Sequence, residues 1–252
     1  DVPLWLAAGV EPVDAVHELL LSGAINIEHG YMGSTPLMNA ATEGQTETVK
    51  LLITKGADRF FVKKSTGDTL LHLAAAYDRY ETVAYLLSLP EPGIDTRNKS
   101  GYSALSYSAS RSDITIVKML LDHGATVDTL TCMGETPLMS ACAAGRVEVA
   151  SLFLDRGANV SSVTEGGVGV LYGAIDNGGF GVGDGTRFEI VKFLLAHGVV
   201  DINATTDDGS TPLHAAVSSG DRFVVETLLA RGADTNATDD QNLDPLGVAV
   251  QG

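Results

Sequence analysis

The chain contains a repeated segment with a period near 33 residues, and this period restricts the possible folds more than any other feature. Residues 34–58, 135–159 and 210–234 align without gaps, and weaker copies fill the intervals. The position that holds threonine in the strong copies falls at residues 2, 35, 69, 103, 136, 169, 211 and 244. A segment this short cannot bury its apolar face alone, so neighbouring copies must stack.

Each copy has the pattern of two helices separated by a break. The strong copies begin with Thr-Pro, as at Thr35-Pro36, which is typical of a helix N-cap followed by a first-turn proline. Apolar residues then recur at helical spacing. Glycine ends the first helix at Gly44, Gly145 and Gly220. Further glycines follow the second helix, where a left-handed residue commonly terminates a helix: Gly56, Gly124, Gly157, Gly198 and Gly232.

The motif TPLHAA…GA at this period covers nearly the whole chain and resembles the ankyrin repeat. The resemblance implies a mainly α solenoid in which each repeat is a β-hairpin finger plus two antiparallel helices. It implies seven full repeats and a partial eighth, in one domain over residues 1–252. Fingers and first helices would line a concave face that binds other proteins. His72 and His214 hold the family's histidine position, which implies a structural role, bonding between neighbouring turns.

One interval of 42 residues places eight extra residues, Gly179 to Thr186, between the two helices of the sixth repeat. The surrounding stretch NGGFGVGDGTRF is rich in glycine. However, a dinucleotide fingerprint requires a preceding strand, and a Walker loop requires Gly-Lys-Ser/Thr. A helix precedes this stretch and it contains no lysine, so we interpret it as a flexible surface insertion. The insertion is either passive or a partner contact through Phe180 and Val182.

The sequence contains no catalytic constellation. The serines lack a Gly-x-Ser-x-Gly setting, and His123 and His197 precede helix-terminating glycines, where a cation interacts favourably with the helix dipole. The two cysteines, Cys132 and Cys142, form no Cys-x-x-Cys pair. We therefore predict that the protein is not an enzyme, that it binds no cofactor and no metal, and that it is intracellular, in the cytoplasm.

The formal net charge of −16 restricts the possible partners. A field of this sign repels phosphate backbones and anionic membranes, so we expect no nucleic-acid partner. No apolar run reaches the roughly 18 residues that a membrane span requires, so we expect no membrane insertion. A basic partner would suit the charge, although acidity for solubility alone is the simpler explanation.

The resemblance places partner recognition on hairpin tips and on exposed residues of the first helices. Repeats two to five supply aromatic, methionine and cationic candidates: Tyr31, Met32, Tyr77, Lys99, Tyr102, Arg111 and Met133. Repeats six to eight supply acidic candidates: Glu165, Asp176, Asp207, Asp208 and Asp240. Because tyrosine, arginine and methionine are enriched at interface cores, we predict a protein–protein interaction module for a partner with a basic and apolar segment. Packing between adjacent fingers is the alternative role for the tyrosines and methionines.

A second interpretation is a targeting or regulatory ankyrin domain of a larger protein, such as a channel, kinase or ubiquitin ligase. The chain opens on Asp1 rather than Met, and its eighth repeat ends after one helix with the apolar segment LDPLGVAVQG. Capping repeats with a polar outer face normally close such a stack, so we expect further sequence or a covering neighbour there. We expect a monomer, or a part of a larger chain or complex.

Overall fold

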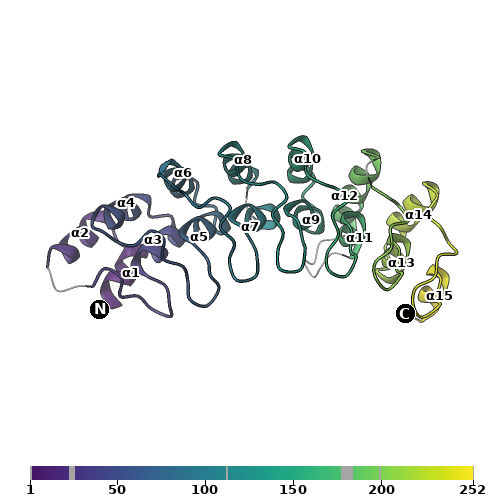
Figure 1. Cartoon of the computed structure of the whole chain (residues 1–252), viewed down its shortest axis with the longest axis horizontal. Coiled ribbons are helices and arrows are strands. Elements are labelled where there is room, and N and C mark those ends of the chain that lie inside the picture. Colours follow the sequence, from purple (N-terminus) through teal and green to yellow (C-terminus); the bar gives the residue numbers. More distant parts are fainter. Residues whose placement is uncertain (1, 23–25, 112, 177–183, 199, 252) are drawn as a thin grey trace. The chain divides into compact units, whose positions relative to one another are not determined.

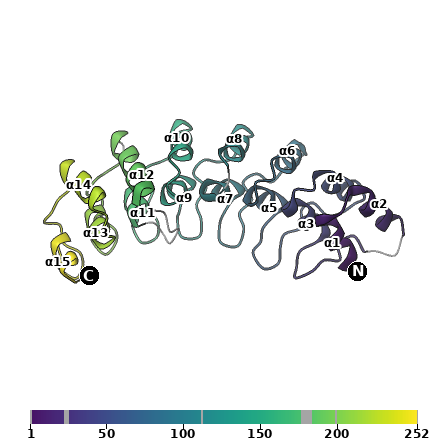
Figure 2. The ribbon, with the colours of Figure 1, turned by 180° about the vertical axis from the view of Figure 1, so that it is seen from behind.

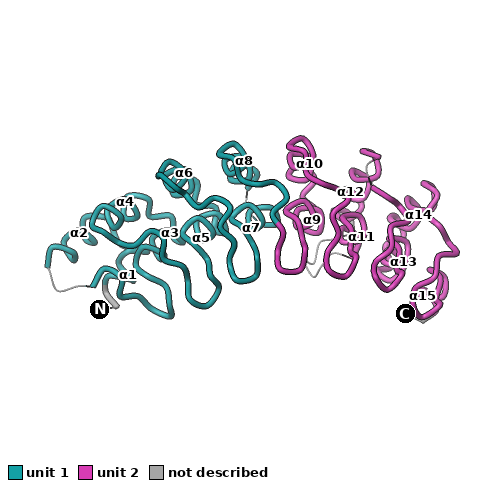
Figure 3. Tube along the Cα trace, viewed as in Figure 1, with its two compact units in different colours: residues 1–129 teal, residues 130–252 magenta. Residues whose placement is uncertain are grey.

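The computed structural model describes residues 2–22, 26–111, 113–176, 184–198 and 200–251. Within these residues the chain is mainly helical, with fifteen helices and no β strand, which agrees with seven helix pairs and one single helix. Its contacts divide the chain into two compact units, residues 1–129 and 130–252, called here the first and second unit (Figure 3). That both belong to one domain stays a prediction.

The first unit consists of an inner and an outer layer of helices (Figures 1 and 2). Its inner helices are α1 (Val2–Val10), α3 (Pro36–Glu43), α5 (Leu70–Ala76) and α7 (Ala104–Arg111). Its outer helices are α2 (Val13–Leu21), α4 (Thr46–Thr54), α6 (Tyr80–Ser88) and α8 (Ile114–Asp122). Each inner helix packs against the next inner helix and against the outer helix of its own repeat.

The second unit repeats this arrangement. Its inner helices are α9 (Pro137–Ala143), α11 (Val170–Asp176), α13 (Pro212–Ser218) and α15 (Pro245–Gln251). Its outer helices are α10 (Val147–Asp155), α12 (Asp184–Ala196) and α14 (Arg222–Ala230). Contacts again join successive inner helices, successive outer helices and the two helices of each repeat. The loops between repeats form the fingers.

The predicted threonine caps start the inner helices. The Thr35 hydroxyl accepts a hydrogen bond from the Met38 amide at 3.3 Å, and Thr136 accepts one from Met139 at 3.2 Å. Proline occupies the first turn of both helices, where its missing N–H removes no hydrogen bond. Small buried residues such as Ala40 allow neighbouring inner helices to approach closely.

The predicted glycine stops are confirmed. Glycines between the helices of a repeat and after the outer helices adopt positive φ, for example Gly44 at 79° and Gly56 at 92°. The fingers, by contrast, do not form the β strands of the predicted hairpins in the described residues. Only isolated antiparallel bridges are present there, Tyr31 with Ser34 and Val163 with Gly169.

The glycine-rich insertion is described only in part. Helix α12 begins at Asp184, so the last three inserted residues belong to its first turn and not to a flexible loop. The prediction of a loop up to Thr186 is therefore wrong for these residues. Phe180 and Val182, the suggested partner contacts, lie outside the described residues.

Candidate functional site

The fingers are joined to one another at their tips by backbone hydrogen bonds. In each finger concerned, one amide donates to a carbonyl of the preceding finger, and we call this residue the tip position. In the first unit the pair is Lys99 N to Thr66 O at 2.9 Å. In the second unit the pairs are Glu165 N to Met133 O (2.9 Å), Asp207 N to Gly166 O (3.0 Å) and Asp240 N to Asp208 O (2.8 Å).

Side chains at the tip position are exposed, and their charge differs between the units. Lys64 lies at the corresponding place one finger before Lys99, although its own amide is not among these bonds between fingers in the described residues. It follows Lys63, whose amide donates to Asp68 O. In the next finger the amide of Asn98, which precedes Lys99, donates to Tyr102 O in the same way. The tip position therefore carries Lys99 in the first unit, with Lys64 at the corresponding place one finger earlier, and Glu165, Asp207 and Asp240 in the second. Sequence reasoning missed Lys64 because its finger contains one extra residue, which shifts the alignment.

The second unit contains a groove of about 670 Å³ between its fingers and its inner helices. Three carboxylates line it, from Asp176 at the end of α11 and from Asp208 and Asp239 on two fingers. Tyr172 and His214 also line it, from α11 and α13. We call this site the acidic groove. The predicted residues Asp176 and Asp208 thus share one site, whereas Asp239 and Tyr172 were not predicted as members.

Two of the three carboxylates of the acidic groove accept local hydrogen bonds. Hydrogen bonds from the Thr206 hydroxyl, and then from the Ser210 amide, lower the pKa of Asp208. Asp239 accepts from the amides of Gln241 and Leu243, both at 2.9 Å. Because these donors fix the carboxylates before any partner arrives, a cationic side chain could pair with them without reordering the fingers.

Tyr172 remains a neutral phenol beside these anions. Burial raises its pKa, and the negative charges of Asp176 and Asp208 raise it further. The side chain is half-buried, as expected for a residue that packs within the stack, yet it also faces the groove. It therefore offers an aromatic surface between two carboxylates.

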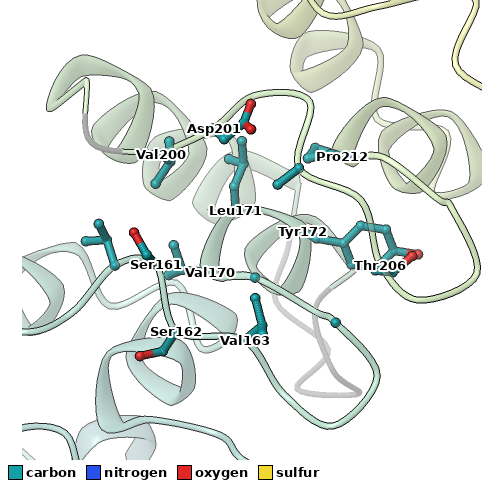
Figure 4. A pocket seen from close by; sticks show the side chains of 14 residues that line it. Ser161, Ser162, Val163, Val170, Leu171, Tyr172, Val200, Asp201, Thr206 and Pro212 are labelled. Atoms are coloured by element: carbon teal, nitrogen blue, oxygen red, sulfur yellow. The ribbon is translucent and has the colours of Figure 1, made fainter.

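Tyr172 also lines a second, smaller cavity of about 170 Å³ (Figure 4). Its walls are mostly apolar and include Val163, Val170 and Leu171, with Tyr172 beside Thr206 at one side. The cavity adjoins the cap position of the sixth repeat, where Gly169 replaces the threonine of the strong copies. Because glycine lacks the side chain that threonine would place here, space remains beside α11.

The predicted aromatic and methionine residues of the first unit differ in how exposed their side chains are. Met32 and Tyr31, at the first described finger, are 81% and 52% exposed, and Tyr77 at the end of α5 is 54% exposed. Tyr102 is half-buried and stacks on Tyr107, with ring centroids 5.3 Å apart and an interplanar angle of 7°. For Tyr102 the structure therefore supports a packing role beside the predicted recognition role.

The remaining predicted residues are also at the surface. Arg111, at the end of α7, is exposed and lies near Tyr107, whose pKa its charge lowers against the larger effect of burial. Met133 is 63% exposed on a finger of the second unit. All the predicted site residues except Tyr102 are thus exposed side chains of fingers or inner-helix ends.

His72 and His214 are structural residues, as the resemblance implies. His72 is buried, and its Nδ1 lies 3.2 Å from the Thr69 amide while its Nε2 lies 2.8 Å from Tyr102 O in the next finger. Because the amide only donates and the carbonyl only accepts, Nε2 carries the proton. His214 makes the same pair of contacts to Thr211 and Leu243 O. Each histidine thus joins two consecutive repeats.

Burial of His72 predicts a pH-dependent stability. Desolvation lowers its pKa below the ordinary 6.5, against the raising effects of the Tyr102 carbonyl and Asp68. Below pH 6.5 the imidazole of His72 is therefore protonated in the unfolded chain but stays neutral in the folded one. The free energy of unfolding falls as the pH drops through this range, and it levels off below the pKa of folded His72. Urea unfolding from pH 7.5 to pH 5 should show a smaller loss for His72→Phe than for the unsubstituted chain. Equal losses would contradict this assignment.

The described residues contain neither a cluster of potential metal ligands nor a helix that could span a membrane. No group of three or more His, Cys, Asp or Glu side chains in the described ranges could hold a metal ion, so the acidic groove is not such a site. Among the helices that the structure describes, none is long and apolar enough to span a membrane. Cys132 is exposed and Cys142 is buried, and no disulfide joins them.

Comparison with known proteins gives a consistent picture. A family model described as ankyrin repeats, in three copies, matches residues 4–96, 89–164 and 182–239. B-cell lymphoma 3 protein homolog of Mus musculus is 28% identical over 99% of this chain and 48% of its own length. NF-kappa-B inhibitor zeta of Homo sapiens is 27% identical over 77% of this chain and 23% of its own length.

The fold has a counterpart among solved structures. The crystal structure of the ankyrin repeat domain of Bcl-3, described as a unique member of the IkappaB protein family, matches with a TM-score of 0.59 and 26% sequence identity. The match covers 99% of this chain and 94% of that domain. The chain spans less than half the length of the curated relatives named above.

Proposed function

Because the chain belongs to the ankyrin repeat family, we propose that it is a non-catalytic module that binds a partner polypeptide along its fingers and inner helices. This surface is the concave face of the predicted solenoid. The observation that carries the proposal is the acidic groove, in which Asp176, Asp208 and Asp239 line one depression. Pre-oriented carboxylates beside an aromatic ring favour a segment that carries lysine or arginine together with apolar side chains.

The relatives support a regulatory protein as the partner. The name of NF-kappa-B inhibitor zeta states that this relative inhibits NF-kappa-B. We propose that the present chain likewise binds a protein rather than a small molecule, with the predicted site residues as contacts and with Tyr172 and Asp239 added. The two cysteines without a disulfide and the similarity to IkappaB-type proteins support an intracellular, cytoplasmic location.

The second candidate function is that of a targeting or regulatory domain within a larger protein. The observation that favours it is length, since the chain spans 48% of one relative and 23% of another. Both candidates use the same binding surface. They differ in whether partner binding controls an activity located elsewhere in the same polypeptide.

Binding of a short labelled peptide that alternates lysine and leucine tests the acidic groove. We expect the double variant Asp176→Asn, Asp208→Asn to weaken this binding about fivefold at low salt, because each exposed ion pair contributes about 0.2–1 kcal/mol. Fluorescence anisotropy would measure the dissociation constants. The matched control is Glu148→Gln, Asp155→Asn, which removes two exposed charges from outer helix α10 of the same unit. An equal loss with the control would attribute binding to net charge and reject the groove.

A further inference from the structure

Two neighbouring fingers of the first unit form a cationic surface on a strongly acidic chain. These fingers precede α5 and α7 and carry Lys63, Lys64, Arg97 and Lys99. Lys64, Arg97 and Lys99 are exposed, and Lys63 is partly exposed. The chain has only 16 lysine and arginine residues, so four of them on two fingers is a local concentration. We call these four residues the cationic tips.

The cationic tips are contiguous with an exposed apolar surface. The ammonium group of Lys99 donates to the carbonyl of Lys64, and the Lys99 amide donates to Thr66 O at 2.9 Å, so the two fingers are in contact. On the other side, a methyl group placed on Gly33 would lie 3.9 Å from Cβ of Lys64. Gly33 directly follows Tyr31 and Met32, which are both exposed. Apolar and cationic side chains therefore adjoin across three successive fingers.

Carboxylates on the same fingers accept hydrogen bonds from neighbouring backbone and side-chain groups. Asp68 is buried and accepts from the Asn98 side chain at 2.8 Å. Asp95 accepts from the amide and the hydroxyl of Thr126, and Asp58 accepts from the Phe60 amide. Lys63, Lys64 and Arg97 form no ion pair with a carboxylate within the described part of the chain. The charges of these three residues are therefore not neutralised by a carboxylate in those ranges, and Lys64 and Arg97 are exposed.

We infer that the cationic tips, together with Tyr31 and Met32, bind an acidic segment of a partner protein that also carries apolar side chains. The inference rests on the proposed function and adds a second charge preference, opposite to that of the acidic groove. Charge complementarity supports this occupant, and Met32 and Tyr31 provide apolar contacts that a polyanion without apolar groups would not use. The net charge of −16 disfavours both a long phosphate backbone and a second copy of the chain.

The test uses a short labelled peptide that alternates glutamate and leucine, with a glutamine–leucine peptide as its neutral analogue. We expect the glutamate peptide to bind more tightly than the analogue, and salt to reduce the difference. The charge reversal Lys64→Glu, Lys99→Glu should weaken binding on the order of tenfold, which corresponds to about 1.4 kcal/mol. Lys64→Arg, Lys99→Arg should retain binding, since it preserves the charge.

The matched control is Lys55→Glu, Lys118→Glu, which changes the net charge equally at exposed positions outside the tips. An equal loss with this control, or no loss with the tip variant, would overturn the inference. So would tighter binding of a single-stranded DNA oligonucleotide through the same lysines, or self-association abolished by the same reversal. The lysine–leucine peptide serves as an independent arm. If it still binds the acidic groove while the glutamate peptide fails, the proposed function stands and only this inference is lost.

Discussion

Replacing Asp221 with alanine is expected to destabilise the second unit by about 3–5 kcal/mol, the usual cost of removing one partner from a buried ion pair. One carboxylate oxygen of Asp221 accepts from the amides of Phe223 and Val224, which caps α14. The other lies 3.6 Å from Nη1 of Arg187 on α12, with the two side chains 1% and 11% exposed. The substitution would therefore remove a cap and leave a guanidinium buried without this counter-charge. Urea unfolding followed by circular dichroism would measure the change.

Two controls separate the cap from the charge. Asp113 caps α8 through the Thr115 amide at 2.7 Å but is exposed, so Asp113→Ala should cost only about 0.5–2 kcal/mol. Asp221→Asn keeps an acceptor for the α14 amides and removes only the charge. If Asp221→Ala and Asp113→Ala proved equally mild, the contact with Arg187 would contribute nothing and the explanation would fail.

Replacing His72 with phenylalanine should cost about 2–3 kcal/mol at neutral pH. The substitution keeps an aromatic ring but deprives the half-buried Thr69 amide of its acceptor and removes one of two donors to Tyr102 O. An unsatisfied buried polar group typically costs about 1–3 kcal/mol. The edge-to-face contact with Tyr107, at 5.7 Å between centroids, would also be disturbed.

His123→Phe is the matched control for His72→Phe. His123 is exposed, and its ring bonds only within its own helix, to Met119 O at 2.8 Å. We expect a change within about 0.5 kcal/mol, as for most surface substitutions. Comparable losses in the two variants, measured by the same unfolding experiment, would indicate that the link between repeats through His72 is not stabilising.

Sequence reasoning predicted the features of this chain that depend on local chemistry. Threonine caps, first-turn prolines and terminating glycines act within a few residues, so their positions could be identified before the structure was known. The structural role of the histidine position followed from the resemblance to the ankyrin repeat. The exposed tips Lys99, Glu165, Asp207 and Asp240 were identified from the same resemblance.

Features that depend on side-chain contacts outside the repeat motif, or on irregular residues, were not predicted. The pair of Arg187 and Asp221 joins two outer helices 34 positions apart in sequence, and no local pattern indicates it. The stacking of Tyr102 on Tyr107 depends on finger geometry. Lys64 was missed through one extra residue in its finger, and the start of α12 was missed because inserted residues continued the helix instead of forming a loop.

The backbone bonds between finger tips separate architecture from specificity. Since main-chain atoms hold adjacent tips in register, any residue with an amide hydrogen can occupy the outermost place without weakening that attachment. A lineage could therefore exchange a lysine for a glutamate there in a single step and redirect one contact while every other contact persists. Such an array would acquire new binding partners gradually, finger by finger, with little risk to its folding.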